Sequence, residues 1–133
     1  MANSIKKNED YQKVYHSGKS YANKYLVMYV MTNDLQKNNQ PINRIGISIS
    51  KKVGNSVVRH RLCRLVRESY RLHEKVFNSG LDIVIVARPS AATVGYNEVE
   101  SALLHLGKLQ KIIKVFFYLI IAFFNSFVTK SLH

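Results

Sequence analysis

The segment 56–76 constrains the fold more than any other part of the chain, because its side chains separate by type on a helical wheel. At about 100° per residue, one arc is apolar or small and the opposite arc is cationic. We therefore predict a helix that packs one face on the core and presents the other to solvent or to an anionic partner. The predicted core arc contains Val58, Leu62, Leu65, Val66, Ser69, Leu72 and Val76. The cationic arc contains Arg59, His60, Arg61, Arg64, Arg67, Arg71 and Lys75, with Cys63 near its edge.

The cationic arc carries more positive charge than solubility requires. No acidic residue lies between Lys51 and Arg67, although a solvated helix face usually interleaves acids that pair with its bases. Arginine dominates the arc, and its planar guanidinium group binds phosphate in a bidentate way that lysine cannot. The whole chain shows the same bias, with 20 Lys and Arg against eight Asp and Glu and a net charge of +12. The pattern predicts a polyanionic partner, either nucleic acid or an acidic membrane surface.

The loop before this helix extends the predicted phosphate-binding surface. Lys51 and Lys52 lead into Gly54, Asn55 and Ser56, and the last two offer side-chain oxygens that can cap the helix. The free N–H groups of a first helical turn attract phosphate. We therefore expect the anionic partner to contact this loop as well as the helix.

Three segments are expected to form strands. Residues 44–50 alternate strictly, with isoleucines on one face and small or polar residues on the other, which indicates a half-buried strand. The apolar run 81–89, stopped by Pro89, predicts a strand in the middle of the sheet. A third strand is expected over 24–32, and the polar segment 33–43 predicts a loop.

Two further helices are expected near the ends of the domain. In the first, Tyr11 and Tyr15 lie four residues apart on one face, before a break at Gly18. The last covers 96–113, with acids early and lysines late, as the helix dipole favours. This order predicts an α+β fold, with one small sheet of about four strands packed against helices. The apolar stripe of the last helix contains Val99, Ala102, Leu103, Leu106, Leu109 and Ile113.

The sequence resembles the protein subunit of bacterial ribonuclease P. The resemblance rests on SKKVGNSVVRHRLCRLVRE, on EDYQKVY, SYANKYLVMYV and RIGISIS before it, and on LDIVIVARP after it. It covers residues 4–114, so we expect an RNA-binding domain over 1–114 and a hydrophobic, helical C-terminal extension over 115–133. In the family's arginine-rich motif, His60 stands in place of asparagine and Cys63 in place of a basic residue. The matching positions are Arg59, Arg61, Arg64 and Arg67.

The resemblance implies both a topology and a function. It implies a mixed sheet in which the basic helix joins parallel strands by an uncommon left-handed βαβ crossover. It also implies a protein that assists a catalytic RNA in the endonucleolytic removal of the 5′ leader from precursor tRNA. The alternative, which needs only the charge, is a general RNA-binding or ribosome-associated protein without a ribozyme partner.

The resemblance assigns site residues to two RNA partners. Its leader-binding cleft includes Tyr11, Tyr15 and Tyr29, and the small residues Ser48 and Ser50 are expected to leave room for the strand. By contrast, Tyr21 and Tyr25 are expected to pack on the core, with Lys24 and Arg88 at the rim of the cleft. The catalytic RNA is expected to contact Lys51, Lys52, Asn55, Arg59, His60, Arg61, Arg64, Arg67 and Arg71.

No catalytic or metal-binding residue is predicted in the chain itself. No two of the eight acids share a motif that could form a two-metal site, and the histidines lack metal-ligand spacing. We therefore expect no cofactor on the protein alone. The resemblance implies that divalent metal, Mg²⁺, belongs to the complete ribonucleoprotein and that the RNA carries the catalytic centre.

The ends of the chain bear on localisation. The first twelve residues contain no apolar export signal, and the single cysteine, Cys63, fits a reducing compartment, so we expect a cytoplasmic protein. Residues 112–128 are mainly hydrophobic but would span only about 25 Å as a helix, less than a bilayer core of about 30 Å. Three interpretations stay open for this tail: an adventitious extension, an extra helix packed on the domain or on a second copy, and a membrane anchor.

Overall fold

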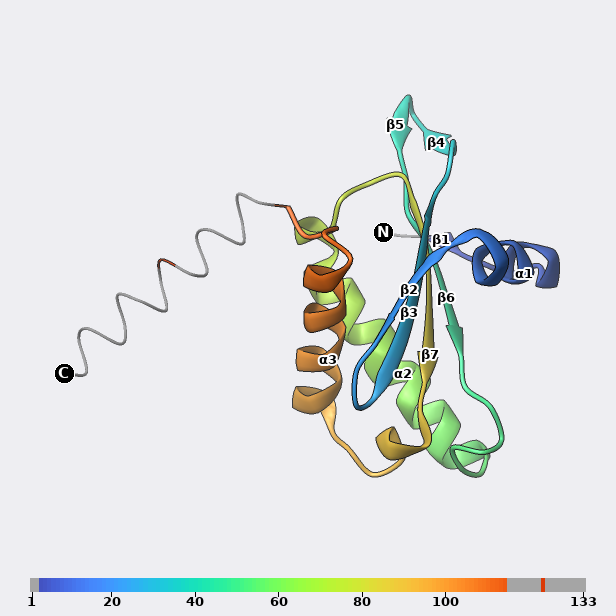
Figure 1. Cartoon of the computed structure of the whole chain (residues 1–133), viewed down its shortest axis with the longest axis vertical. Helices are drawn as coiled ribbons and strands as arrows, with labels where there is room; N and C mark the ends of the chain where they lie inside the picture. Colours follow the sequence, from blue (N-terminus) through green and yellow to red (C-terminus); the bar gives the residue numbers. More distant parts are fainter. Residues whose placement is uncertain (1–2, 115–122, 124–133) are drawn as a thin grey trace.

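The computed structural model describes residues 3–114 and residue 123, and it contains one five-stranded sheet with three α-helices (Figure 1). The predicted extension 115–133 lies outside the described residues, apart from Phe123. The helices are α1 (Asn8–Ser17), α2 (Ser56–His73) and α3 (Tyr96–Leu109). The strands of the main sheet are β1 (Asn3–Ser4), β2 (Lys19–Ala22), β3 (Leu26–Thr32), β6 (Arg44–Ser48) and β7 (Leu81–Ala87).

The strand order β1-β6-β7-β3-β2 places β7 in the middle of the sheet, as its apolar sequence predicted. Strand β7 runs parallel to β6 and antiparallel to β3, so the sheet is mixed. Helix α2 connects β6 to β7, which confirms the βαβ unit, while the hand of its crossover stays a prediction.

The sheet has more strands than the sequence patterns indicated. Strand β1 pairs with β6 over only two residues, and β2 is an exposed edge strand without an apolar alternation. The segment 33–43, predicted as a loop, contains a small hairpin of β4 (Gln36–Lys37) and β5 (Gln40–Pro41). Its turn residues Asn38 and Asn39 have φ values of 54° and 63°, a left-handed conformation that asparagine tolerates.

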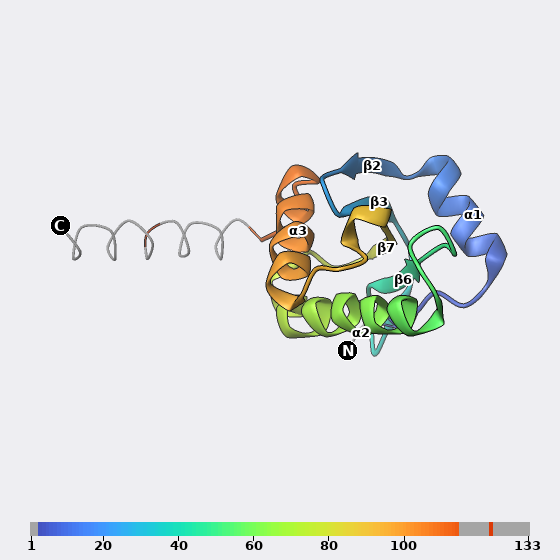
Figure 2. The same cartoon turned by 90° about the horizontal axis from the view of Figure 1, so that it is seen from below.

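The two faces of the sheet carry separate apolar clusters. Helices α2 and α3 cover one face (Figure 2), and Leu26, Met28, Ile83 and Ile85 belong to the main core on that side. Helix α1 packs on the other face through Val14, which meets Val84 and Ile5 in the smaller cluster. The side chains of β3 and β7 therefore alternate between two different environments.

The core face of α2 is rotated from the one predicted. Leu62, Val66 and Ser69 are buried as expected, but Leu72 is 56% exposed, so its placement in the core arc was wrong. Tyr70 is buried instead: its ring lies 5.1 Å from that of Phe77, and its hydroxyl accepts a hydrogen bond from Asn43. Burial raises the pKa of Tyr70, which stays neutral near pH 7.

Helix α3 ends at Leu109, earlier than predicted, and the chain then turns back toward α2. The side chain of Gln110 donates to the carbonyl oxygens of Lys19 and Met28, which fixes the end of the helix on the sheet. Ile112 and Ile113 are buried, and Ile113 forms an isolated bridge with Phe77. The main core therefore extends beyond α3.

Candidate nucleic-acid interface

The three tyrosines predicted to bind the leader lie together, with the ring of Tyr15 between those of Tyr11 and Tyr29. The ring of Tyr29 on β3 meets that of Tyr15 on α1 edge to face, with 5.0 Å between centroids. Tyr15 in turn lies 6.3 Å from Tyr11, one helical turn earlier. All three are half-buried, so each ring is fixed by packing and still partly open to solvent.

The small residue Gly46 on β6 explains where Tyr11 lies. A Cβ atom at Gly46 would be only 2.7–2.8 Å from the Tyr11 ring and hydroxyl. The small outer face of this strand therefore accommodates a protein side chain at Gly46, whereas room for RNA was expected beside Ser48 and Ser50. Burial raises the pKa of Tyr11, and a hydrogen bond with the Ile47 backbone and the charge of Arg67 on α2 oppose that rise.

The same sheet face continues past the tyrosines as a half-exposed strip. Val27, Val86 and Ser48 are paired across β3, β7 and β6, so their side chains form one row. The neighbouring row, formed by Tyr29, Val84 and Gly46, is the one that α1 covers. Ser48 is half-buried and Ser50 is exposed, so the strip opens toward the end of β6 that leads to α2.

A charge cluster holds α1 on this face. Arg44 on β6 binds Asp82 on β7 through two hydrogen bonds of 2.9 and 2.6 Å, and binds Asp10 on α1 at 3.1 Å. The hydrogen bonds to Asp82 and Asp10 raise the pKa of Arg44, so it stays charged. Sequence reasoning missed this cluster, because the two acids lie 72 positions apart and only the fold brings them together.

The arginines of α2 differ in how much of their binding capacity is already used. Arg61 donates from both terminal nitrogens to the carbonyl oxygens of Ala92 and Val94, at 2.7 and 2.8 Å. Arg71 is paired with Glu68 and holds the pKa of that carboxyl below its usual range. Arg64 and Arg67 are exposed on the outer face of the helix.

The remaining predicted contacts gather at the start of α2. Asn55 is the N-cap and its side chain accepts a hydrogen bond from the Val58 backbone N–H, so this residue has a structural role whatever else it contacts. Arg59 donates from Nε to the Gly54 carbonyl, while Lys51 and Lys52 are exposed beside it. No acid occupies the first turn of α2, which leaves its positive end uncompensated. His60 is exposed, and Cys63 lines a shallow hollow between β6 and α2.

Two predicted rim residues lie elsewhere. Lys24 is positioned beside the ring of Tyr25, which packs against the main core together with Tyr21. Arg88 donates to the Asn23 carbonyl at 2.7 Å and so supports the β2–β3 turn. The core role predicted for Tyr21 and Tyr25 fits their packing, but both Lys24 and Tyr25 line a pocket on the α3 side of the sheet.

A basic helix beside a half-open sheet face with aromatic side chains is typical of an RNA-binding protein. The Ribonuclease P family model matches residues 1–111. The ribonuclease P protein component of Lachnoclostridium phytofermentans is 60% identical over 113 residues, which cover 85% of this chain and 93% of that protein. These matches show that the chain belongs to the ribonuclease P protein family.

Solved structures agree with the family and with the fold. The ribonuclease P protein of Staphylococcus aureus is 34% identical, with a TM-score of 0.74, and the match covers 86% of this chain and 100% of that one. The corresponding protein of Thermotoga maritima is 28% identical, with a TM-score of 0.70, over 80% of this chain and 96% of that one. The chain is thus a component of the endoribonuclease that matures the 5′ ends of tRNA, which favours the first of the two functions considered above.

The described residues contain neither a membrane-spanning helix nor a metal-ligand cluster. No helix within 3–114 is long and apolar enough to cross a bilayer. In the same part of the chain, no three His, Cys, Asp or Glu side chains are grouped so that they could hold a metal ion. The three interpretations of the tail all concern residues that lie largely outside that part.

Proposed function

We propose that this chain binds the catalytic RNA of ribonuclease P through the outer face of α2 and guides the 5′ leader of precursor tRNA along the tyrosine groove. The tyrosine groove consists of the three contacting rings of Tyr11, Tyr15 and Tyr29 and the neighbouring strip of Val27, Val86 and Ser48. The observation that carries the proposal is the continuity of the two surfaces. The ring of Tyr11 on α1 packs against Gly46 on β6, and the next residue of that strand, Ile47, lines a hollow together with Arg59 and Cys63 of α2. A strand leaving RNA bound at α2 would therefore reach the groove directly.

The groove suits an unpaired strand of any sequence. Unstacked bases can stack on tyrosine rings for about 1–3 kcal/mol each, and every base has a planar face. The strip of valine and serine offers few hydrogen-bonding side chains that could select one base over another. We therefore expect leader binding to depend weakly on leader sequence.

The outer face of α2 suits the phosphates of a folded RNA. The exposed side chains of Arg64, Arg67, Lys51 and Lys52 lie around a helix start without compensating acids. Each phosphate contact releases counterions, so affinity for the RNA should fall steeply with salt.

We assign the divalent metal of the complex to the RNA. Among the described residues, the carboxylates of Asp10 and Asp82 both bind Arg44, whose positive charge disfavours a metal ion beside them. These two carboxylates therefore do not fit a Mg²⁺ site, which supports assigning the metal to the RNA.

Cleavage of a precursor tRNA by its catalytic RNA at low Mg²⁺ tests the proposal. Adding the protein should increase the cleavage rate, and Tyr29→Leu should weaken binding of a leader-bearing substrate by about fivefold or more. The same variant should bind mature tRNA and catalytic RNA as the unmodified protein does.

The matched control is Tyr96→Leu, which removes a half-buried tyrosine at the start of α3, outside the groove. If this control weakens leader binding as much as Tyr29→Leu, the groove assignment is wrong. If the protein leaves the cleavage rate unchanged at every Mg²⁺ concentration, the proposed function itself fails.

A further inference from the structure

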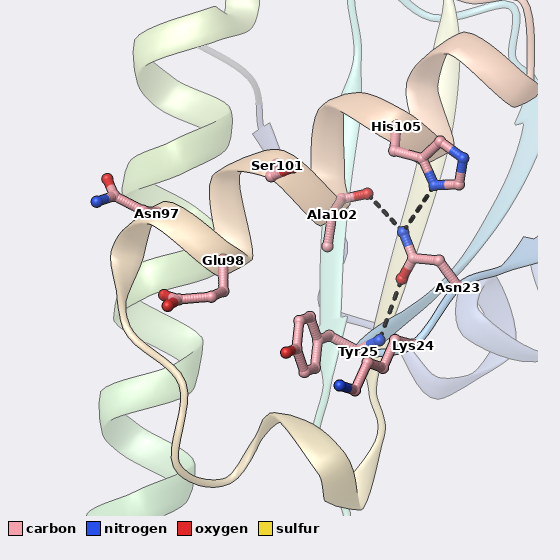
Figure 3. Close-up of a pocket in the computed structure, with 8 residues that line it drawn as sticks. All are labelled: Asn23, Lys24, Tyr25, Asn97, Glu98, Ser101, Ala102 and His105. Carbon is pink, nitrogen blue, oxygen red and sulfur yellow. Dashed lines mark hydrogen bonds between the residues drawn. The ribbon is translucent and has the colours of Figure 1, made fainter.

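The sheet face opposite the groove carries a pocket that neither proposed RNA contact uses. It lies between the β2–β3 turn and the first turns of α3, and has a volume of about 380 Å³ (Figure 3). This is within the range of about 300–1,000 Å³ for small-ligand sites. Asn23, Lys24 and Tyr25 line it from the turn, and Glu98, Ser101 and His105 line it from α3.

The turn that forms one wall is held in place from several directions. The Asn23 side chain donates to the Ala102 carbonyl at 2.9 Å and lies 3.2 Å from the His105 ring, as Figure 3 shows. Its oxygen accepts from the backbone N–H groups of Tyr25 and Leu26. Arg88 binds the Asn23 carbonyl from the other side. A wall this well supported does not need to be ordered by its ligand, which lowers the entropic cost of binding.

The pocket combines an aromatic ring with a cation and hydrogen-bonding groups. The Lys24 ammonium lies 5.4 Å from the centre of the Tyr25 ring. Glu98 uses one carboxylate oxygen to accept from the Gly95 N–H, which leaves other lone pairs for a ligand donor. A planar base, a phosphate and an amino group are the features that these three side chains would recognise together.

The edge strand repeats the pairing of a cation with an aromatic ring. Lys19 lies 5.3 Å from the ring centre of Tyr21, and both tyrosines pack on the α3 side of the sheet. Alternating cations and aromatic rings along an open surface are typical of sites for unpaired nucleic acid. This favours a nucleotide within an RNA strand over an isolated small molecule.

We propose that this pocket binds one unpaired nucleotide of an RNA strand, with its base against Tyr25 and its phosphate at Lys24. The strand continues past Lys19 and Tyr21. Because this surface and the tyrosine groove lie on opposite faces of the sheet, the bound segment is distinct from the leader, and the proposal does not depend on the leader assignment.

An NMR titration of the full chain tests the base and the phosphate separately. Cytidine 5′-monophosphate should shift the signals of Asn23, Ser101 and His105. Ribose 5-phosphate, which lacks the base, should need at least about a fivefold higher concentration to produce the same shifts. A five-nucleotide cytidine RNA should bind more tightly than the mononucleotide. Equal shifts by ribose 5-phosphate would show a plain anion site, and tighter binding of the mononucleotide would exclude the RNA strand; either result overturns the proposal.

Variants locate the binding to named side chains. Tyr25→Leu should lower the affinity for cytidine 5′-monophosphate by about fivefold or more. Tyr25→Phe, which keeps the ring, should have an affinity within about twofold of that of the unmodified protein. Lys24→Gln should weaken binding and Lys37→Gln, an exposed lysine in the β4–β5 hairpin, should not.

Tyr29→Leu separates this inference from the proposed function, since it should leave the pocket signals unchanged. Thermal unfolding checks that each variant is folded. If Tyr25→Leu is unfolded, the comparison of Lys24→Gln with Lys37→Gln and the titration with ribose 5-phosphate still show whether the pocket binds a nucleotide. Unchanged affinity in Lys24→Gln, or pocket signals that respond only when Tyr29 is intact, would refute the site.

Discussion

Arg61 and Arg64 lie three residues apart on α2, but their guanidinium groups have different surroundings. Arg61 donates to two backbone carbonyls of the segment before α3, and Arg64 is exposed. Hydrogen bonds from a charged donor contribute about 1.5–3 kcal/mol each. We expect Arg61→Gln to lower the free energy of unfolding by about 2 kcal/mol and Arg64→Gln to leave it almost unchanged.

RNA binding by the same two variants should show the opposite order. Arg64→Gln should reduce the slope of log affinity against log salt by roughly 0.7–0.9, and Arg61→Gln by clearly less. Urea unfolding and binding to the catalytic RNA across a salt series measure the two effects. Equal changes of slope in both variants would mean that Arg61 leaves its carbonyl partners when RNA binds.

Gly46 is the residue on which the position of Tyr11 depends. In Gly46→Ala the new methyl group would overlap the far end of the Tyr11 side chain, which can swing away more easily than the backbone can move. We expect a loss of about 1 kcal/mol in stability and weaker leader binding, with binding to catalytic RNA unaffected. Gly95→Ala is the control, since its nearest contact would be an ordinary 3.4 Å to Glu98. Unaltered leader binding in Gly46→Ala would show that Tyr11 need not occupy this position.

At the residue scale, sequence patterns predicted side-chain types better than side-chain partners. The tyrosines expected in the groove do lie together. The bonds of Arg61 and the charge cluster around Arg44 depend on contacts between distant segments, which no local pattern encodes. The signal for Gly46 was visible as a small residue on an alternating strand, but only the fold places Tyr11 against it.

Helix α1 carries two of the groove tyrosines, and the ion pair between Asp10 and Arg44 links the helix to the sheet. Both side chains are partly exposed, at 29% and 22%, so the pair alone contributes about 1 kcal/mol or less. We expect Asp10→Asn to change overall stability little but to weaken leader binding, because α1 is held less firmly. Asp34→Asn, in an exposed loop, is the control, and fluorescence anisotropy of a labelled leader gives the affinity.

Helix α2 begins at a cap that also lies on the proposed RNA surface, and two substitutions separate these roles. Asn55→Ala removes the bond to Val58 N–H and should cost about 1 kcal/mol of stability. Asn55→Asp keeps a capping oxygen but adds a negative charge, so it should preserve stability and weaken RNA binding. Thermal unfolding and RNA affinity check both. Undiminished RNA affinity in Asn55→Asp would confine Asn55 to its capping role.

At the element scale, helices and apolar strands were predictable because their periodicity is strong. The buried run of β7 and the alternation of β6 indicated their places correctly. Strand β2 and the β4–β5 hairpin escaped detection, since edge strands are exposed and carry little apolar pattern. The face of α2 was misjudged because Tyr70, rather than Leu72, fills the space beside Phe77.

At the scale of the whole molecule, the main core of the described residues includes the two isoleucines after α3. Ile112 and Ile113 are 7% and 9% exposed, and the Asn78 N–H donates to the Ile112 carbonyl at 2.7 Å. We expect a chain that ends at Lys114 to unfold at the same temperature as the full chain. One that ends at Lys111 should lose about 2 kcal/mol or more, because buried side chains are removed. Calorimetry of the two truncated chains tests this boundary of the folded domain. A large loss of stability in the chain that ends at Lys114 would place the boundary within 115–133.

The central position of β7 has a consequence for synthesis of the chain. Among the strands of the main sheet, β7 is the last to leave the ribosome, yet it alone joins the β1–β6 pair to the β2–β3 pair. Until it emerges, the nascent polypeptide has two unconnected halves, and α2 has no completed sheet to bury its apolar side. During translation, an arginine-rich segment is therefore exposed, close to ribosomal RNA, before the domain that orients it can fold.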